Sequence, residues 1–500
     1  MSGRRQRVAV VGSGAGGMGA MYALRHAEHC EVHLFEAAKE WGGHIHTHRY
    51  EKDGLRAGVD FGFIGFNPAT YPNFTAAVRD LGLELNHPPN SLGISRGYGA
   101  LEWSTDRVFA QPSNLLRPSF WRMLFDIIRF NNTSLDILIE EAEEKASGVV
   151  TERRLETLRQ YLARENYSEQ FREDYLVPMT RLIWLMEMEQ TRSDLPVRML
   201  IRYMWNHHFL ITLAKGHDWY SIKGGSRTYL EAILHSYPDN QLHLNSPVLS
   251  VRNRDNSDGQ GRLAVEIGSP DGSRRIEFFD HVILACHAPQ ILQILGPEAT
   301  EEEKRILGAF KTTTKDIVFH SDTSVMPNRR SAWSCWNHKD SGDPKSVKQM
   351  DDPQQWTSCW INLAMNIPED KFGPLFTTTP PEGVDPSRIH ARWTASHPWF
   401  TPEAVSSQEL IPSIQNKRGI SYAGAWMGYG AHEDGFSAGL RAAVEHVGAK
   451  VPFEIRDARF VEGVIPKYGF WDHVIRFIIR IIQSLIMLWV GKVSTDTGSS

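Results

Sequence analysis

The chain has 500 residues, of which 41% are hydrophobic and 23% are charged, and its formal net charge is −5. These proportions exclude a disordered or fibrous protein, and the length suggests roughly three domain-sized units. The 54 basic residues form no long stripe, so we expect no nucleic-acid partner. The four cysteines include no C-x-x-C pair, which excludes a disulfide scaffold and fits a reducing, intracellular compartment.

The first residues predict a strand rather than a targeting segment. Residues 1–7 are basic, but no apolar signal-peptide region follows them, so we expect no signal peptide. Residues 8–11 are a short β-branched run, which indicates a buried parallel strand. We expect a helix over 18–26 and a second strand over 31–35.

A glycine-rich turn lies between the first strand and the first helix, and it meets the pattern G-x-G-x-x-G. The three glycines of this pattern permit a tight turn, the approach of a pyrophosphate, and close packing of helix on strand. Glu36 ends the second strand, where an acidic side chain accepts hydrogen bonds from a ribose hydroxyl. The sequence therefore predicts a dinucleotide site that contains Gly12, Ser13, Gly14, Ala15, Gly16, Gly17, Glu36 and Ala37.

A second glycine pair, Gly42-Gly43, is followed by His44 and then by Thr47, and it lets the chain fold back over a diphosphate. Together with Glu36, this segment resembles the second signature of the flavin amine-oxidase superfamily, which usually has Arg where this chain has His44. A neutral His donates to a phosphate less strongly than Arg does. The superfamily includes phytoene-desaturase-like enzymes and fatty-acid double-bond isomerases. The resemblance implies FAD, with Gly42, Gly43, His44 and Phe63 near it.

The other end of the chain resembles the same superfamily. A strand at 420–426 leads to a glycine-rich turn at 428–436 and a helix of small residues at 437–444. In the superfamily this unit closes over the flavin ring, and the helix N-terminus favours negative charge there. Relatives often have Glu where this chain has Trp426, so ribityl binding should depend more on Asp434. The implied contacts are Gly424, Glu433, Asp434, Gly435 and Phe436.

Further blocks extend the resemblance along the chain. Residues 223–226 precede a predicted helix. Residues 246–248 end a strand, and the resemblance implies that the backbone of Val248 contacts adenine. Residues 280–285 resemble the strand that comes late in the chain of these relatives and leads to the flavin. Asn206-His207-x-x-Leu210 and the motif at 429–435 are most similar to a poorly characterised branch, whose members often accompany lipid-modifying enzymes.

These blocks predict an α/β fold, with an α+β arrangement for the chain as a whole. A discontinuous Rossmann-like FAD-binding domain is expected over 1–66, 215–290 and 415–450, with an inserted substrate domain of mixed sheet and helices over 67–214 and 291–414. Apolar spacing of three and four predicts helices over 120–130, 136–146 and 153–164. Strands are expected over 316–320 and 356–363, and exposed loops over 256–261 and 341–352.

The C-terminal segment, 466–492, predicts an amphipathic helix. Asp472, His473, Arg476, Arg480, Gln483 and Ser484 share one face of it. A spanning helix would place Arg476 and Arg480 in hydrocarbon at roughly 2.5–3.5 kcal/mol each. The helix therefore lies on a membrane surface or packs on the protein's own body. Trp471, Trp489 and the basic face favour a peripheral membrane contact through 470–490.

Two residues are candidates for the chemistry. Lys315 begins an apolar strand and resembles the lysine with which monoamine oxidases hold a water against the flavin; its positive charge would assist re-oxidation by oxygen. The alternative is an exposed lysine. His432 could act as acid or base, or make a structural hydrogen bond. No metal site is expected, and FAD should be non-covalent, since covalent relatives use a cysteine near the closing block and none lies beyond Cys359.

The favoured hypothesis is an FAD-dependent oxidoreductase that abstracts hydride from a C–H bond of a fatty-acyl, isoprenoid or polyketide-like substrate and forms a double bond. The apolar C-terminal helix, the lipid-associated relatives and the lack of a clear amine-recognising acid favour it. The alternatives are a redox-neutral double-bond isomerase of unsaturated fatty acids, an amine oxidase that uses oxygen, and a non-enzymatic flavoprotein scaffold. Substrate identity, electron acceptor and oligomeric state remain open at this point.

Overall fold

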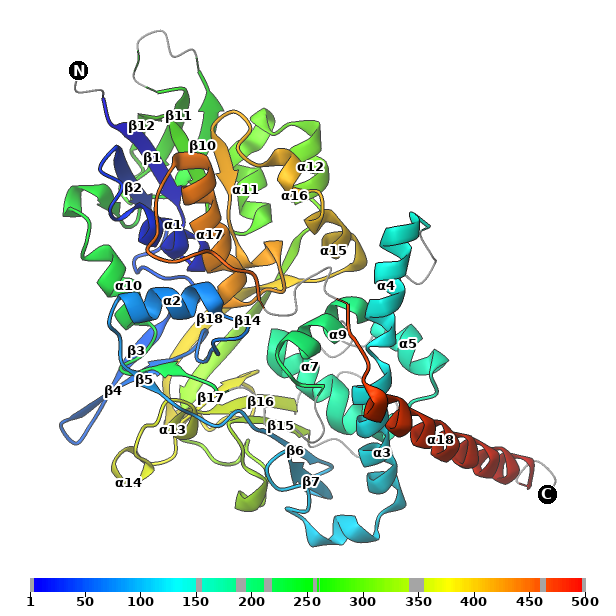
Figure 1. Ribbon diagram of the computed structural model, residues 1–500. Coiled ribbons are helices and arrows are strands. Elements are labelled where there is room, and N and C mark those ends of the chain that lie inside the picture. Colours follow the sequence, from blue (N-terminus) through cyan, green and yellow to red (C-terminus); the bar gives the residue numbers. More distant parts are fainter. Residues whose placement is uncertain are drawn as a thin grey trace.

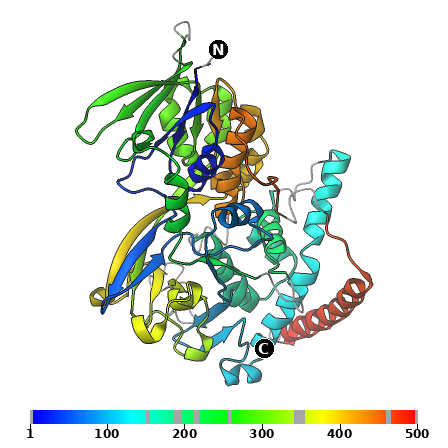
Figure 2. The same ribbon diagram turned by 60° about the vertical axis from the view of Figure 1, so that its left-hand side comes forward.

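The computed structural model describes residues 4–149, 155–185, 195–210, 218–254, 259, 261–340, 355–458 and 465–496. Two large sheets, smaller sheets and flanking helices make up the body, and one long helix lies on the body's side at the C-terminal end (Figures 1 and 2). The loops predicted at 256–261 and 341–352 fall largely or wholly outside the described residues.

The first sheet has five parallel strands that come from distant parts of the chain. In spatial order they are β19 (Ile420–Tyr422), β13 (His281–Leu284), β1 (Gln6–Val11), β2 (Cys30–Phe35) and β9 (Leu242–His243). β1 is central, and Val8, Ala9 and Val10 are fully buried, which explains its continuous apolar run. The strands predicted near both termini are confirmed, although β19 ends at Tyr422, earlier than expected.

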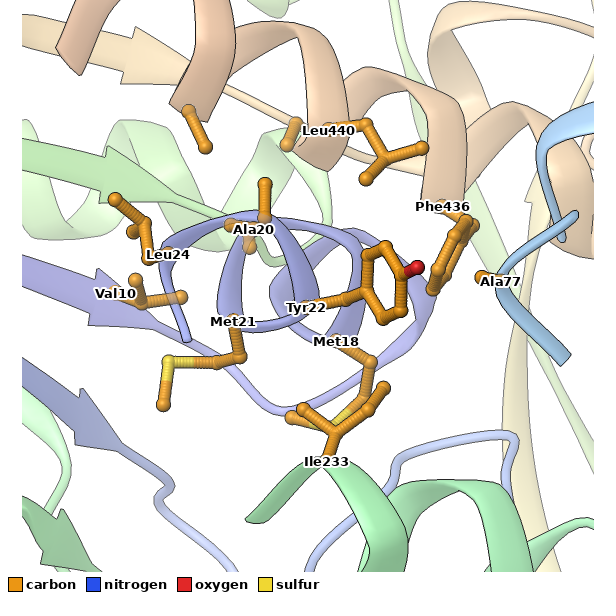
Figure 3. Packing of buried hydrophobic residues seen from close by; sticks show 14 of the residues in the cluster. Val10, Met18, Ala20, Met21, Tyr22, Leu24, Ala77, Ile233, Phe436 and Leu440 are labelled. Carbon is orange, nitrogen blue, oxygen red and sulfur yellow. The ribbon is translucent and has the colours of Figure 1, made fainter. Parts of the chain in front are cut away.

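Two helices cross closely on this sheet, α1 (Ala15–Leu24) and α17 (His432–Val447). Glycines allow the contact: a Cβ atom at Gly439 would lie 1.9 Å from the carbonyl oxygen of Gly16. Figure 3 shows Phe436 and Leu440 of α17 packed on α1, with Ala77 of α2 (Pro72–Asp80) and Ile233 of α10 (Arg227–Leu234) nearby. Both crossing helices begin earlier than predicted.

A three-stranded antiparallel sheet lies beside the parallel one, with β10 (Val248–Asn253), β11 (Leu263–Gly268) and β12 (Arg274–Phe279). Val248 begins β10, so the prediction that 246–248 ends a strand was wrong. Pro247 has no N–H to donate, which is why the ladder starts after it. Four helices cover this region: α11 (Ala288–Leu295), α12 (Glu301–Leu307), α15 (Pro402–Gln408) and α16 (Ile411–Ile414).

The second large sheet has seven strands and is mixed, because β15 and β6 alone are parallel neighbours in it. Its order is β18 (Ile389–Trp399), β14 (Lys311–His320), β17 (Phe376–Thr379), β16 (Gln355–Trp360), β15 (Trp336–Asp340), β6 (Leu92–Arg96) and β7 (Leu101–Ser104). The strand predicted at 316–320 is confirmed within β14. The strand predicted at 356–363 stops at Trp360, where α13 (Ile361–Ala364) begins. The Asn362 side chain turns the chain there by bonding the backbone of Ile367, Gly373 and Leu375.

Short pairings connect these layers: the hairpin β3 (Thr47–Lys52) and β4 (Leu55–Asp60), and β5 (Leu85–Asn86) with β8 (Ser221–Ile222). The predicted domain boundaries stay a prediction.

A helical layer lies beside the second sheet: α3 (Pro118–Thr133), α4 (Asp136–Ser147), α5 (Leu158–Arg164), α6 (Glu169–Phe171), α7 (Val177–Trp184) and α9 (Val197–Asn206). Two of the predicted helices are confirmed as α3 and α4. The third begins at Leu158 rather than near 153, because Thr157 and Gln160 form a capping box there. The C-terminal helix, α18 (Phe470–Asp496), packs on α3. Among the described helices, none is long and apolar enough to span a bilayer.

Candidate functional site

A large cavity, about 1620 Å³ in volume, is lined by the parallel sheet, the seven-stranded sheet and the helical layer. Typical ligand pockets reach about 1,000 Å³, so this one has room for a dinucleotide and a second molecule. The glycine turn after β1, the second glycine pair and the closing block at 424–432 line one part of it. Residues far apart in the sequence therefore meet at one site.

The three glycines after β1 are required for different reasons. Gly12 has a φ of +98°, and a Cβ atom there would lie 2.8 Å from the carbonyl oxygen of Ala285. A Cβ atom at Gly17 would lie 1.9 Å from the carbonyl oxygen of Gly12, so this glycine lets α1 pack on the strand. Gly14 is the opposite case, because no atom lies within 4 Å of its Cβ position. Gly14 lines the cavity, and a pyrophosphate can approach its backbone there.

Glu36 joins the turn to the end of β2. Its carboxylate accepts hydrogen bonds from the N–H groups of Ser13 and Ala38, both at 2.9 Å, and from the Ser13 hydroxyl at 2.6 Å. The Ser13 hydroxyl in turn accepts from the Gly42 N–H at 2.8 Å, which ties in the second glycine pair. A carboxylate can accept about four hydrogen bonds, so Glu36 keeps one position for a ribose hydroxyl.

His44 presents an unsatisfied polar atom at the cavity. Its ring lies 4.7 Å from that of His397, 6.4 Å from that of His287 and 5.4 Å from that of Trp393. Burial and these neighbouring imidazoles hold the pKa of His44 well below its ordinary value, so the ring is neutral. Its Nε2 is buried, and no hydrogen-bond partner for it exists among the described residues. A phosphate oxygen is the kind of acceptor this nitrogen needs, so the residues here fit a dinucleotide.

The His44→Ala variant should bind FAD about tenfold more weakly, because it loses one neutral hydrogen bond to the cofactor. The loss should be the same at pH 6 and pH 8, since the lowered pKa keeps His44 neutral throughout that range. Titration of the apoprotein with FAD, followed by quenching of flavin fluorescence, measures it. Unchanged affinity would remove His44 from the site.

The closing block is held by aromatic side chains. A Cβ atom at Gly424 would lie 2.3 Å from Nε1 of Trp426, which donates to the Cys286 carbonyl oxygen at 3.0 Å. Trp426, where relatives often have Glu, therefore ties the closing block to the end of β13. His432 stacks on Phe63 at 3.8 Å between ring centroids.

The His432 side chain also makes a hydrogen bond. Its Nε2 lies 2.8 Å from the Tyr229 hydroxyl, and burial lowers its pKa to about 3. Such an imidazole is a weak base at neutral pH, so the geometry favours a positioning role for His432 over proton transfer.

The side chains of Glu433 and Asp434 bind the protein's own backbone. Glu433 accepts from the N–H groups of Asn73 and Phe74 at the start of α2. Asp434 accepts from the N–H groups of Tyr429 and Ala431, and burial raises the pKa of both carboxyls to about 7. Contact of these residues with a cofactor stays a prediction, as it does for the other predicted residues outside the cavity lining: Gly17, Gly42, Lys315, Gly435 and Phe436. The remaining predicted site residues line the cavity: Gly12, Ser13, Gly14, Ala15, Gly16, Glu36, Ala37, Gly43, His44, Phe63, Val248, Gly424 and His432.

Lys315 does not line the cavity, but it shares a face of β14 with Ile317, which does, and its charge helps to lower the pKa of His397 in the lining. It is directly opposite Ala395 of β18, and opposite residues in an antiparallel pair share a face. Ala395 and His397 both line the cavity. Burial and the nearby Arg181 lower the pKa of Lys315 to about 8. The lysine is therefore close enough to add positive charge to this wall.

Many residues in the rest of the cavity are apolar or aromatic, and polar side chains such as Asn131, Asp218 and Thr377 lie among them. The rings of Tyr203 and His207 stack at 3.9 Å, and Tyr203 meets Tyr429 edge-on at 6.1 Å. No lysine or arginine is found among the lining residues that the structure describes. The lining beyond the glycine turns includes Val108, Leu124, Ile127, Met179, Leu182, Ile183, Trp184, Tyr203, Phe209, Trp219 and Tyr429.

Sequence reasoning missed three side chains of this site: His287, His397 and Tyr203. His287 follows the late strand by three residues, so its position after β13 was a usable signal. His397 and Tyr203 carry no local signal, because only the pairing of β18 with β14 and the packing of α9 bring them here. Within the described ranges, no group of three His, Cys, Asp or Glu residues could hold a metal ion.

Comparison with known proteins agrees with this geometry. The profile of flavin containing amine oxidoreductases matches residues 16–320, more than half of the chain. An L-amino-acid oxidase from Pseudechis australis is 38% identical over 85 residues, which cover 16% of this chain and only 15% of that protein.

Solved structures of low identity share the fold. Cyclohexylamine oxidase from Brevibacterium oxydans has a TM-score of 0.59 at 16% identity, and a CLA-producing fatty acid isomerase from P. acnes has 0.57 at 12%. Each comparison covers 89% of this chain and 99% of the other. The family implies FAD, which the glycine cradle, Glu36 and His44 fit. The chain is therefore an FAD-dependent oxidoreductase that belongs to the flavin containing amine oxidoreductase family.

Proposed function

We propose that this enzyme abstracts hydride from a C–H bond of a hydrophobic substrate, fatty-acyl, isoprenoid or polyketide-like, and so forms a double bond. The observation that carries the proposal is the large apolar and aromatic part of the lining beyond the glycine cradle, and the lining includes no described lysine or arginine. A free carboxylate in that part would lose its hydration without a lysine or arginine in the lining to pair with. The lining therefore favours an uncharged chain, such as an acyl chain whose polar head stays outside.

The reaction balances with FAD as the hydride acceptor. One carbon of the substrate gives up a hydride, its neighbour gives up a proton to solvent, and a C=C bond remains; the two electrons then pass to oxygen or another acceptor. The protein's share is to orient the chain and exclude water. We infer non-covalent attachment, because Cys286 lines the cavity but burial raises the pKa of its thiol to about 12.

Amine oxidation is a second candidate, favoured by the edge-on rings of Tyr203 and Tyr429 in the cavity. Aromatic faces attract an amine, and two of the similar structures are a cyclohexylamine oxidase and a putrescine oxidase. A double-bond isomerase would use the same apolar cavity and return the hydride to another carbon.

Anaerobic mixing of the FAD-loaded protein with defined probes separates these reactions. The probes are dioleoyl phosphatidylcholine, oleic acid, geranylgeraniol, benzylamine and putrescine. We expect lasting loss of visible flavin absorbance with an acyl or isoprenoid probe. A moved double bond without net flavin reduction would indicate isomerisation, and peroxide release in air with an amine would indicate amine oxidation; either result contradicts the proposed desaturation.

The Lys315→Met variant should react with oxygen about tenfold more slowly after reduction by dithionite, because a positive charge favours superoxide formation nearby. In the unaltered enzyme this rate should fall as pH rises through about 8, the pKa of Lys315, since the ammonium loses its charge there. Stopped-flow mixing with aerated buffer measures both effects without any substrate. Lys311→Met, on the exposed start of β14, is the control; equal rates for both variants would leave Lys315 a structural lysine.

A further inference from the structure

The C-terminal helix α18 is fixed to the body by its polar side. Arg476 is only 7% exposed, pairs with Asp136 at the start of α4, and donates to the Asn132 carbonyl oxygen at 2.6 Å. Its guanidinium lies 4.2 Å from the ring centre of Tyr468. Of the two arrangements left open for this helix, the structure shows its polar side packed on the body through Arg476, because Asp136 supplies a counter-charge there. This ion pair sets which side of the helix faces outward.

The residues of α18 fall into three arcs at 100° per residue. The docking arc is buried or half-buried and carries Asp472, Arg476, Ile479, Gln483 and Ile486. A narrow exposed arc, polar except for Met487, carries His473, Arg480, Ser484 and Met487. A third arc of about 140° is exposed and apolar; it carries Phe470, Trp471, Phe477, Ile478, Ile481, Ile482, Leu485 and Leu488.

The width of the apolar arc indicates which kind of partner could cover it. A partner helix in a coiled coil needs only a narrow apolar seam, two positions in seven, whereas a helix lying in a membrane interface presents a broad apolar face. Aromatic residues begin the arc, and Ser484 lies at its polar border, followed by His473 and Arg480. In Figures 1 and 2 the helix, drawn in red, stands out from the body with its far side uncovered.

A second exposed apolar patch lies on η1 (Pro112–Leu116) and the first half of α3. Leu116 is 86% exposed, and the Trp121 ring lies 5.8 Å from that of Phe109 and donates to the Leu115 carbonyl oxygen. The exposed residues of the cavity lining include Thr105 and Asp106, which shortly precede this patch in the chain, and others elsewhere, such as His87 and Asp218. Leu124 and Ile127 of α3 line the cavity, while α18 packs on the same helix.

We propose that α18 docks flat on the surface of a lipid bilayer, with its apolar arc in the headgroup boundary and the patch on η1 and α3 close to the same surface. This contact places the exposed part of the cavity lining at 105–106 near the bilayer. Delivery of an acyl chain from the membrane to the cavity is a consequence that rests on the proposed function, whereas membrane docking itself does not.

Flotation of the FAD-loaded full-length protein with dioleoyl phosphatidylcholine vesicles tests the docking without any turnover. The unaltered protein should float with the vesicles, and should still do so at high salt, because apolar burial rather than charge drives the contact. The double variant Phe477→Glu/Leu485→Glu should bind at least about tenfold more weakly. These side chains are 65% and 61% exposed, so their replacement leaves the fold and the FAD content unchanged.

Ile276→Glu is the matched control, since Ile276 is 60% exposed on β12, far from α18 in the fold. It should float like the unaltered protein. Failure of the unaltered protein to float, or equal flotation of the double variant, overturns the proposal. A dimer in sedimentation that the double variant converts to a monomer, with no vesicle binding, would instead assign the apolar arc to a second copy of the chain.

Discussion

The Gly14→Ala variant should fold normally and yet lose FAD, with an affinity lower by roughly a hundredfold or more. Gly14 has a φ of −66° and a ψ of −171°, which alanine adopts without strain, and no protein atom would touch the new methyl group within 4 Å. The methyl would project into the cavity where the backbone receives a pyrophosphate. The visible spectrum of the purified protein and an FAD titration measure the loss, and circular dichroism checks the fold.

Alanine substitutions at two other glycines provide comparisons for this test. Gly469→Ala should keep its FAD, because Gly469 lies outside the cavity lining and its nearest contact would be Asp472 Oδ2 at 3.5 Å. Gly17→Ala should fail to fold, since its methyl would lie 1.9 Å from the Gly12 carbonyl oxygen. A yellow Gly14→Ala protein with ordinary affinity would contradict the assignment of the cradle.

The part of the site that could be predicted from the sequence is the part set by local geometry. Gly12, Gly14 and Glu36 follow buried strands at short, fixed spacings. In a dinucleotide-binding fold these positions require a glycine or an acidic residue, so the residues can be recognised from the sequence. The position of the first strand was predictable for the same reason, since the last four residues of β1 are buried and form a continuous apolar run.

The rest depends on contacts between distant segments. His397 reaches His44 only because β18 pairs with β14, and the resulting cluster of imidazoles decides the charge of His44. The face of α18 that meets the body could not be predicted either. Helical periodicity groups Arg476 with the polar residues, but the carboxylate of Asp136, 340 residues earlier, draws it inward. Such counter-charges have no local signature.

Arg418→Ala should lower the free energy of unfolding by about 3 kcal/mol, because it removes one partner of a buried ion pair. Arg418 donates to both carboxylate oxygens of Glu303 at 2.6 Å, and the Tyr422 hydroxyl donates to one of them at 2.6 Å. The Glu303 side chain is 2% exposed, so losing Arg418 leaves its charge poorly compensated. Tyr422 ends β19, the strand that brings Gly424 to the cavity, so the cluster also anchors the closing block.

The size of this loss should depend on pH in a defined direction. Burial alone would raise the pKa of Glu303, but bonds from Tyr422, the Thr300 N–H and Arg418 outweigh it and hold the pKa below its ordinary value. A lowered carboxyl pKa stabilises the folded state above the unfolded value of about 4.3, and this contribution is lost as pH falls through the folded pKa. Urea unfolding should therefore show the full difference between variant and unaltered protein at pH 7 and a smaller one below about pH 4.

Arg441→Ala is the matched control, because Arg441 forms a pair of similar length with Asp457, at 2.7 Å, but on the exposed surface. Exposed pairs contribute about 1 kcal/mol or less, so this variant should unfold nearly like the unaltered protein. Equal losses for Arg418→Ala and Arg441→Ala would show that burial of Glu303 adds nothing to the pair. If only Arg418→Ala lowers the free energy of unfolding, and this variant also releases FAD more readily on partial unfolding, then the contact with Glu303 outside the parallel sheet holds β19 in place.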